Sequence, residues 1–98
     1  VILDVRETSE VEASGKAEGA VHIPRGLLEF RADPESPMHL PELTQDKTVL
    51  LYCASGGRSA LAGKTLKDMG YTEVYNIGGF KTWADAGKPV EPATTYQS

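Results

Sequence analysis

Apolar and polar positions divide the 98-residue chain into short alternating segments of two kinds. Short runs rich in Val, Ile, Leu and Tyr are typical of strands, and they occur at residues 1–5, 20–23, 48–52 and 73–77. Stretches with apolar side chains at helical spacing follow them, at residues 9–14, 26–32, 59–69 and 80–86. The alternation of strand and helix predicts an α/β fold with a mainly parallel sheet and helices on both faces.

Capping and breaking residues indicate where these segments end. Thr8 can cap the first helix, and Gly70 can close the helix at 59–69. Glycine and proline clusters predict loops or turns at residues 15–19, 33–41 and 78–79. The order of segments then places the carboxyl ends of the strands at one edge of the sheet, which is where α/β folds bind ligands.

Length and composition support one soluble globular domain. Hydrophobic residues make up 40% of the chain and charged residues 24%, which is ordinary for such a domain. We predict that the domain spans residues 1–90 and that residues 91–98 form a polar, irregular tail. The net charge of -4 argues against a nucleic-acid partner, and no apolar run approaches the roughly 18 residues that a membrane span needs.

The chain holds a single cysteine, Cys53. An internal disulfide and a two-thiol mechanism are therefore excluded, and one cysteine with two histidines argues against a structural zinc site. A lone reactive thiol suits a reducing compartment, so we expect the protein in the cytoplasm.

Candidate chemistry is concentrated where the strand at 48–52 leads into the helix at 59–69. The intervening segment is Cys53-Ala54-Ser55-Gly56-Gly57-Arg58-Ser59. Its small residues let backbone N–H groups turn inward, and the helix N-terminus and an arginine add positive charge. These groups should lower the pKa of the thiol and make it a nucleophile. The same N–H groups could stabilise the outer sulfur of a persulfide.

A simpler interpretation of Cys53 competes with this one. A lone cysteine after a buried strand is most often a small core residue. The glycine loop, the helix start and Arg58 together favour the functional interpretation, although such loops also bind phosphates. Asp4 and Arg6, which follow another buried strand, are candidate supporting residues, and a structural charge pair is the favoured role for them.

With these residues in view, the sequence resembles the rhodanese family. Four segments carry the resemblance, in order along nearly the whole chain. They are Asp4-Val5-Arg6-Glu7, then Gly19-Ala20-Val21-His22-Ile23-Pro24, then residues 53–59, and then Gly78-Gly79 with Trp83. Domains of this family usually begin with a strand and a helix ahead of the first motif, so the resemblance implies that this chain starts inside the domain.

The resemblance implies a sulfurtransferase that needs no metal or organic cofactor. Cys53 would accept a sulfane sulfur from thiosulfate, mercaptopyruvate or a protein persulfide and pass it to a thiol or cyanide. By position, residues 54–59 would cradle the persulfide, and Arg58 would close the loop. Small neutral residues stand at Ala54 and Ser55, where thiosulfate-specialised relatives carry cations, which implies that thiosulfate is a poor or surrogate donor.

Two alternatives stay open. Related cell-cycle phosphatases use a loop of seven residues ending in arginine, whereas residues 53–58 make six, which favours sulfur over phosphate. An aryl phosphatase or arsenate reductase is therefore disfavoured. The second alternative is a rhodanese-like module used only for binding or regulation. Such modules commonly lose the cysteine, which this chain keeps.

Overall fold

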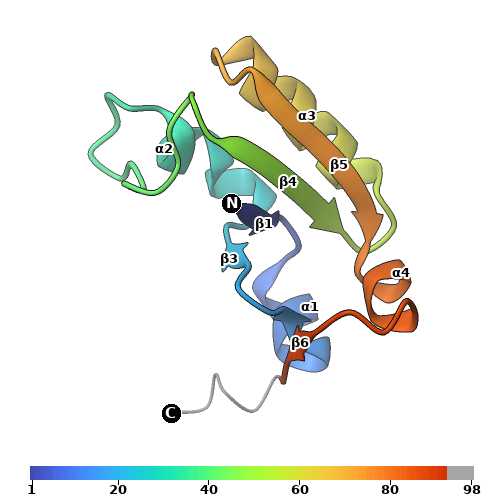
Figure 1. Ribbon diagram of the computed structural model, residues 1–98. Coiled ribbons are helices and arrows are strands. Elements are labelled where there is room, and N and C mark those ends of the chain that lie inside the picture. The colour runs from blue at the N-terminus through green and yellow to red at the C-terminus, as the bar shows by residue number, and fades with distance from the viewer. Residues whose placement is uncertain (93–98) are drawn as a thin grey trace.

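The computed structural model describes residues 1–92 (Figure 1). The chain forms the following elements in order: β1 (Ile2–Asp4), α1 (Thr8–Ser14), β2 (Lys16–Ala17), β3 (Val21–His22), η1 (Arg25–Leu27), α2 (Leu28–Ala32), β4 (Thr48–Cys53), α3 (Gly57–Asp68), β5 (Glu73–Gly79), α4 (Phe80–Asp85) and β6 (Val90–Glu91).

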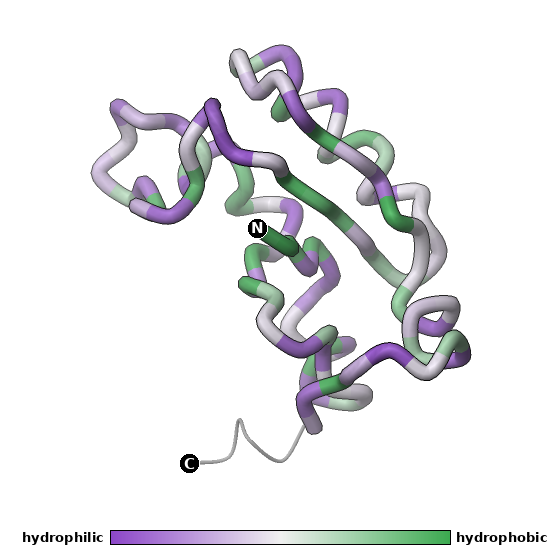
Figure 2. The backbone as a smooth tube through the Cα atoms, viewed as in Figure 1, coloured by the Kyte–Doolittle hydropathy of each residue, from purple (hydrophilic) through white to green (hydrophobic). Residues whose placement is uncertain are grey.

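The main sheet has the strand order β3-β1-β4-β5, and all neighbouring strands are parallel. This confirms the predicted α/β fold with a mainly parallel sheet flanked by helices. The most apolar strand, β4, lies inside the sheet between β1 and β5, and Figure 2 shows hydrophobic residues concentrated along it. Since the strands are parallel, the ends of β4 and β5 meet, and Cys53 is paired with Gly79.

One face of the sheet carries most of the core. Leu3 and Leu51 on the strands pack with Leu28 of α2 and with Ala62 and Leu66 of α3, and all five are fully buried. Burial of apolar area of this kind is the main favourable contribution to folding. This burial holds α3 along β4 and β5, as Figure 1 shows. The N-terminus of α3 is thereby held near the end of β4.

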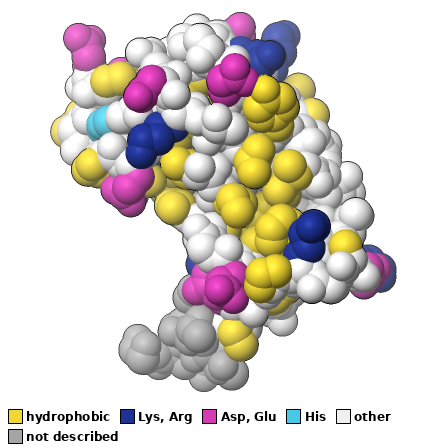
Figure 3. Space-filling view, viewed as in Figure 1, with side chains coloured by type: hydrophobic (Ala, Val, Ile, Leu, Met, Phe, Trp, Pro, Cys, Tyr) yellow, Lys and Arg dark blue, Asp and Glu magenta, His cyan; other side chains and the backbone are white. Residues whose placement is uncertain are grey.

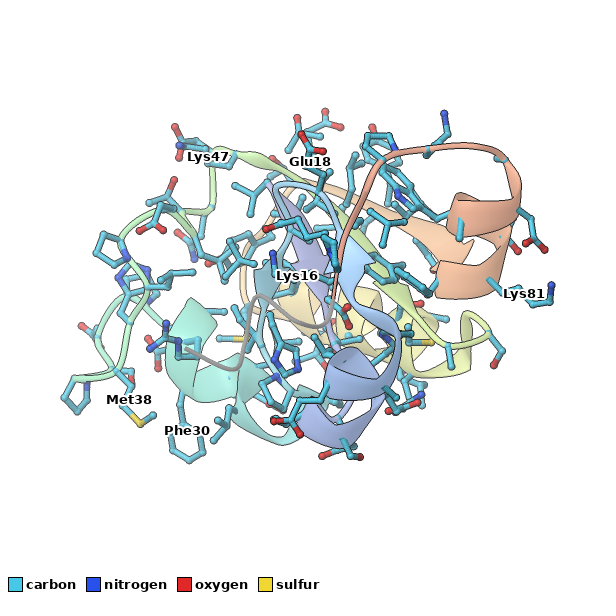
Figure 4. The ribbon with its side chains drawn as sticks, turned by 90° about the horizontal axis from the view of Figure 1, so that it is seen from below. Lys16, Glu18, Phe30, Met38, Lys47 and Lys81 are labelled. Atoms are coloured by element: carbon cyan, nitrogen blue, oxygen red, sulfur yellow. The ribbon has the colours of Figure 1, made fainter. Side chains whose placement is uncertain are left out.

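The opposite face is covered less completely. Tyr52 is buried there and its ring lies 6.1 Å from that of Phe80 in α4, centroid to centroid. Further along the same face Tyr75 is 51% exposed. Figure 3 shows apolar side chains in a band over the region where Figure 1 draws β4 and β5. The side chains in Figure 4 include Lys81 of α4, which extends away from the body of the molecule.

A second, two-stranded sheet was not predicted. β2 and β6 pair in antiparallel fashion. β2 lies in a segment expected to be loop, and β6 crosses the predicted boundary between domain and tail. An ion pair of 2.5 Å between Lys16 and Glu91 supports the pairing. Strands of two residues contain no alternation that a pattern can reveal, which explains the error. Residues 93–98 of the predicted tail lie outside the described residues.

Helix boundaries also differ in detail. Thr8 is the first residue of α1 and Glu7 is the N-cap, so the predicted Thr8 cap was wrong. Glu10 explains the difference, because its Oε2 accepts the Glu7 N–H at 2.8 Å and completes a capping box. Gly70 ends α3 with a left-handed φ of 97°, as predicted. The turn predicted at residues 78–79 is the end of β5.

Candidate active site

Cys53 is the last residue of β4, and α3 begins four residues later, at Gly57. Its side chain lies beneath the loop and is almost fully buried, while Ala54 and Ser55 are exposed above it. The Gly56 N–H donates to Sγ at 3.0 Å, and the Ser59 N–H donates to it at 3.4 Å. The Ser59 hydroxyl is a third donor, at 3.5 Å. The loop thus directs backbone N–H groups at the sulfur atom, as the sequence predicted, and the Ser59 hydroxyl adds a donor that was not predicted.

Two glycines give the loop its shape for different reasons. Gly56 has a left-handed φ of 101°, which L side chains rarely adopt. Gly79, at the end of β5, touches the loop from outside, and a Cβ there would lie only 2.3 Å from the carbonyl oxygen of Ala54. Gly79 is therefore explained by the close approach of two backbones, whereas Gly78 before it has open space around it and a left-handed φ of 96°. By contrast, a Cβ on Gly57 would meet nothing within 4 Å.

The surroundings of Cys53 favour the thiolate. Burial alone raises the pKa of this thiol, because a charge is costly away from water. Hydrogen bonds from the Ser59 hydroxyl, and from the N–H groups of Ser59, Ser55 and Gly56, lower it more, and the resulting pKa is about 7. At neutral pH a substantial share of the side chain is then ionised, which is the form that attacks electrophilic sulfur.

Arg58 is held by a residue that the sequence analysis did not single out. Glu10 of α1 accepts hydrogen bonds from both terminal nitrogens of the Arg58 guanidinium, at 2.7 and 2.8 Å. This pairing lowers the pKa of Glu10 to about 2. The planar donors of Arg58 are thus directed at a carboxylate. The two residues are 48 positions apart, so no spacing in the sequence indicated the contact.

Asn76 of β5 is a second residue that the sequence did not indicate. Its Oδ1 accepts the Ser59 hydroxyl at 2.7 Å, and its Nδ2 donates to the carbonyl of Gly56 at 3.0 Å. The only available signal was indirect: parallel neighbouring strands end together, so the end of β5 was expected near the end of β4.

Asp4 and Arg6 form a buried ion pair away from the sulfur. Arg6 Nη2 lies 2.8 Å from Asp4 Oδ2, and it also donates to the carbonyl of Gly15 at 2.7 Å. Tyr52 donates its hydroxyl to Asp4 at 2.6 Å. These partners belong to β1, β4 and the end of α1, which fits the favoured interpretation of a structural charge pair.

Among residues 1–92, no three His, Cys, Asp or Glu side chains gather as they would around a metal ion. None of the helices in the same range has the length and apolar character that crossing a membrane requires.

Comparison with known proteins agrees with this geometry. The family model described as Rhodanese-like domain matches residues 1–86. YqhL of Bacillus subtilis, an uncharacterised protein, is 42% identical over 83 residues, which are 84% of this chain and 59% of YqhL. A protein of Allochromatium vinosum named sulfurtransferase is 33% identical over 91 residues, covering 92% of this chain and 77% of that protein.

A solved structure gives the same result for the fold. RPA3614 of Rhodopseudomonas palustris, described as a protein of unknown function and possible tyrosine phosphatase, superposes with a TM-score of 0.87 at 50% identity. The match covers 93% of this chain and 70% of that one. The strand-loop-helix site and these matches define one class of protein, and the chain belongs to the rhodanese family. Its relatives include proteins named sulfurtransferase.

Proposed function

We propose that the protein is a rhodanese-type sulfurtransferase that carries a sulfane sulfur on Cys53. The observation that supports this most directly is the set of hydrogen bonds to Sγ from Gly56 and Ser59, which holds the pKa of a buried thiol at about 7. A core cysteine without a chemical role has no need of such donors, since burial in apolar surroundings keeps a thiol protonated.

The reaction has two displacement steps. In the first, the Cys53 thiolate attacks the outer sulfur of the donor, an Sγ–S bond forms, and the bond from that sulfur to the donor breaks. The leaving group takes the electron pair and departs as sulfite, as the enolate of pyruvate or as a protein thiolate, depending on the donor. In the second, cyanide or a thiolate attacks the outer sulfur of the Cys53 persulfide, and the Cys53 thiolate leaves.

The loop N–H groups have the same function in both steps. They donate to the sulfur of Cys53 when it is a thiolate. In a persulfide the negative charge lies on the outer sulfur, which the same N–H groups would stabilise. Because these donors are fixed by the α3 start and by Gly56, they need no reorganisation as charge moves between the two sulfurs.

The charges around the loop indicate which kind of compound can supply sulfur to Cys53. Ala54 and Ser55 are neutral, and the guanidinium of Arg58 is already paired with Glu10. A dianion such as thiosulfate would find no free cation among these residues. We therefore propose a persulfide on another protein or on a small thiol as the preferred donor, in a cytoplasmic setting where thiols stay reduced.

The test is intact mass spectrometry after incubation with thiosulfate, mercaptopyruvate or a small-molecule persulfide, with Cys53→Ser as the matched control. A gain of one sulfur atom that cyanide removes, and that the variant lacks, is the expected result. The persulfide donor should load Cys53 fastest. Failure of every donor to add sulfur would reject the sulfurtransferase and favour a binding module.

The description of RPA3614 as a possible tyrosine phosphatase raises a second candidate. Six residues from Cys53 to Arg58 form a smaller ring than the seven that the related phosphatases use, which opposes a tetrahedral phosphate. Turnover of an aryl phosphate that Cys53→Ser abolishes would revive the phosphatase. We expect none.

A further inference from the structure

The Ser59 hydroxyl lies among three acceptors but has one proton to donate. Its Oγ is 2.7 Å from Asn76 Oδ1, 3.2 Å from the carbonyl oxygen of Gly56 and 3.5 Å from Cys53 Sγ. A hydroxyl hydrogen rotates to the best acceptor available. Which acceptor it reaches therefore depends on the charge of the sulfur.

The Asn76 amide is held in one orientation. Its Nδ2 donates to the carbonyl of Gly56 at 3.0 Å, and its Oδ1 accepts the N–H of Gly78 at 3.0 Å. Turning the amide over would bring two donors together at Gly78 and two acceptors together at Gly56. Oδ1 must therefore face Ser59, and Ser59 must be the donor in that contact.

We propose that Asn76 is a positioning residue that acts on Cys53 through the proton of the Ser59 hydroxyl. The proposal rests on the sulfurtransferase function for its purpose, but its geometry does not depend on a sulfur donor. In the thiol form, Ser59 donates to Asn76, and the Cys53 S–H can donate to the Ser59 oxygen. When Cys53 ionises, its proton leaves to solvent, and the Ser59 hydroxyl rotates to donate to the thiolate.

The rotation leaves no group unsatisfied. Asn76 Oδ1 keeps the Gly78 N–H after the hydroxyl has turned away. The new bond from Ser59 has an ionised acceptor, and such bonds are stronger than those between neutral groups. Asn76 thus competes with Cys53 for one proton and sets how readily the thiolate gains its third donor. The same exchange recurs each time the thiolate is released at the end of a transfer cycle.

The test measures the pKa of Cys53 from the pH dependence of its alkylation by iodoacetamide. The variants are Asn76→Asp, Asn76→Ala and Ser59→Ala, with each Asn76 change also made in the Ser59→Ala background. Asn76 is exposed, so its replacement should leave the fold intact, which a denaturation curve checks for each variant. A cycle of this kind isolates the energy that passes through the contact between the two residues.

The two substitutions should couple to Ser59 with opposite signs. A carboxylate at position 76 holds the hydroxyl more strongly, so Asn76→Asp should raise the pKa of Cys53 by about one unit, a tenfold loss of thiolate well below the pKa. In the Ser59→Ala background only the through-space effect of the charge remains, so the rise should be smaller. Asn76→Ala removes the acceptor that competes for the Ser59 proton. The change that it causes in the pKa of Cys53 should therefore be more negative when Ser59 is present than in the Ser59→Ala background.

If either substitution shifts the pKa of Cys53 equally in the two backgrounds, the proposal is overturned. Asn76 would then have only a structural role in holding the loop. Sulfur loading of the same variants separates this outcome from a failure of the proposed function. Opposite couplings in a protein that never takes up sulfur would support the role of Asn76 and reject the sulfurtransferase. If the protein takes up sulfur but the pKa shifts are equal in the two backgrounds, the sulfurtransferase is supported and the role of Asn76 is rejected.

Discussion

Two arginine side chains, Arg6 and Arg58, each form a double hydrogen-bonded pair with a carboxylate, but their access to water differs. The Arg6 and Asp4 side chains are 4% and 0% exposed, whereas those of Arg58 and Glu10 are 37% and 33% exposed. The Arg6 guanidinium also lies 4.3 Å from the centre of the Phe80 ring. The first pair is therefore enclosed by the fold, and the second lies at its surface beside the loop.

The difference shows how one type of contact can serve two purposes. Charges inside a protein have lost their hydration, so each depends on its partner, and removing either leaves the other uncompensated. Charges at the surface can exchange their partner for water at little cost. Asp4 and Arg6 thus fix the end of β1 against α1, whereas Glu10 and Arg58 can adjust around Cys53.

Asp4→Ala should give the largest loss of stability, because it leaves the Arg6 charge and the Tyr52 hydroxyl without their buried acceptor. We expect the free energy of unfolding to fall by about 3–5 kcal/mol, measured by urea denaturation. The matched control is Asp85→Ala, which breaks the exposed pair between Lys81 and Asp85, and it should leave the free energy of unfolding nearly unchanged. Similar losses in the two variants would remove the distinction between enclosed and exposed pairs.

Gly79→Ala tests whether the loop beside the exposed pair is nevertheless tightly packed. A Cβ at this position would collide with the carbonyl of Ala54, so the variant should lose about 1–3 kcal/mol and react more slowly with iodoacetamide at pH 7. Gly57→Ala, in the same region but with open space around it, should be neutral or gain up to about 1 kcal/mol. Tolerance of Gly79→Ala would show that the loop adapts as freely as the surface pair.

The charge of Cys53 should make stability depend on pH. Its pKa is about 7 in the folded chain, whereas a free thiol has a pKa of about 8.5, so the unfolded chain binds more protons between these values. The free energy of unfolding should therefore rise with pH across this window, by about 1–2 kcal/mol, and the gain should be lost as pH falls through 7. Subtracting the same series for Cys53→Ser removes other titrating groups. A flat difference between the two proteins would contradict the lowered pKa.

Glu10→Gln should give the smallest effect on stability, below about 1 kcal/mol, because Arg58 can turn to water. With its carboxylate partner neutralised, Arg58 should act more strongly on the thiolate and lower the pKa of Cys53 by a few tenths of a unit. The shift should shrink as salt is added, since the charges are partly exposed. An increase in the pKa would mean that Glu10 stabilises the thiolate by orienting Arg58, and that orientation outweighs charge.

Much of this arrangement follows from local pattern. The continuous apolar run of β4 and the glycines after it identified a buried strand followed by a tight loop, and the spacing of Ala62 and Leu66 identified the helix. These features depend on residues that are close together in the chain, so residue type and spacing are enough to predict them. The loop residues 53–59 were accordingly found together, with Cys53 under its N–H donors.

What escaped prediction depends on residues brought together from afar. Neither Glu10 nor Asn76 was indicated by the sequence pattern. Their partners, Arg58 and Ser59, are 48 and 17 positions away, and only the packing of α1 and β5 brings them into reach. The β2–β6 ladder was missed for the same reason, because two residues define no period and their partners lie 75 positions apart.

The order of strands in the sheet has a consequence for the newly made chain. The donors to the Cys53 sulfur are positioned by Asn76 and by the close approach of Gly79, and both residues belong to a strand made after the cysteine itself. Contacts between distant segments form late, because closing long stretches of chain costs entropy. Until β5 has docked, the thiol should have the ordinary reactivity of a cysteine in a flexible peptide. The lowered pKa of the thiol, and the reactivity that comes with it, would then arise only when the fold is complete.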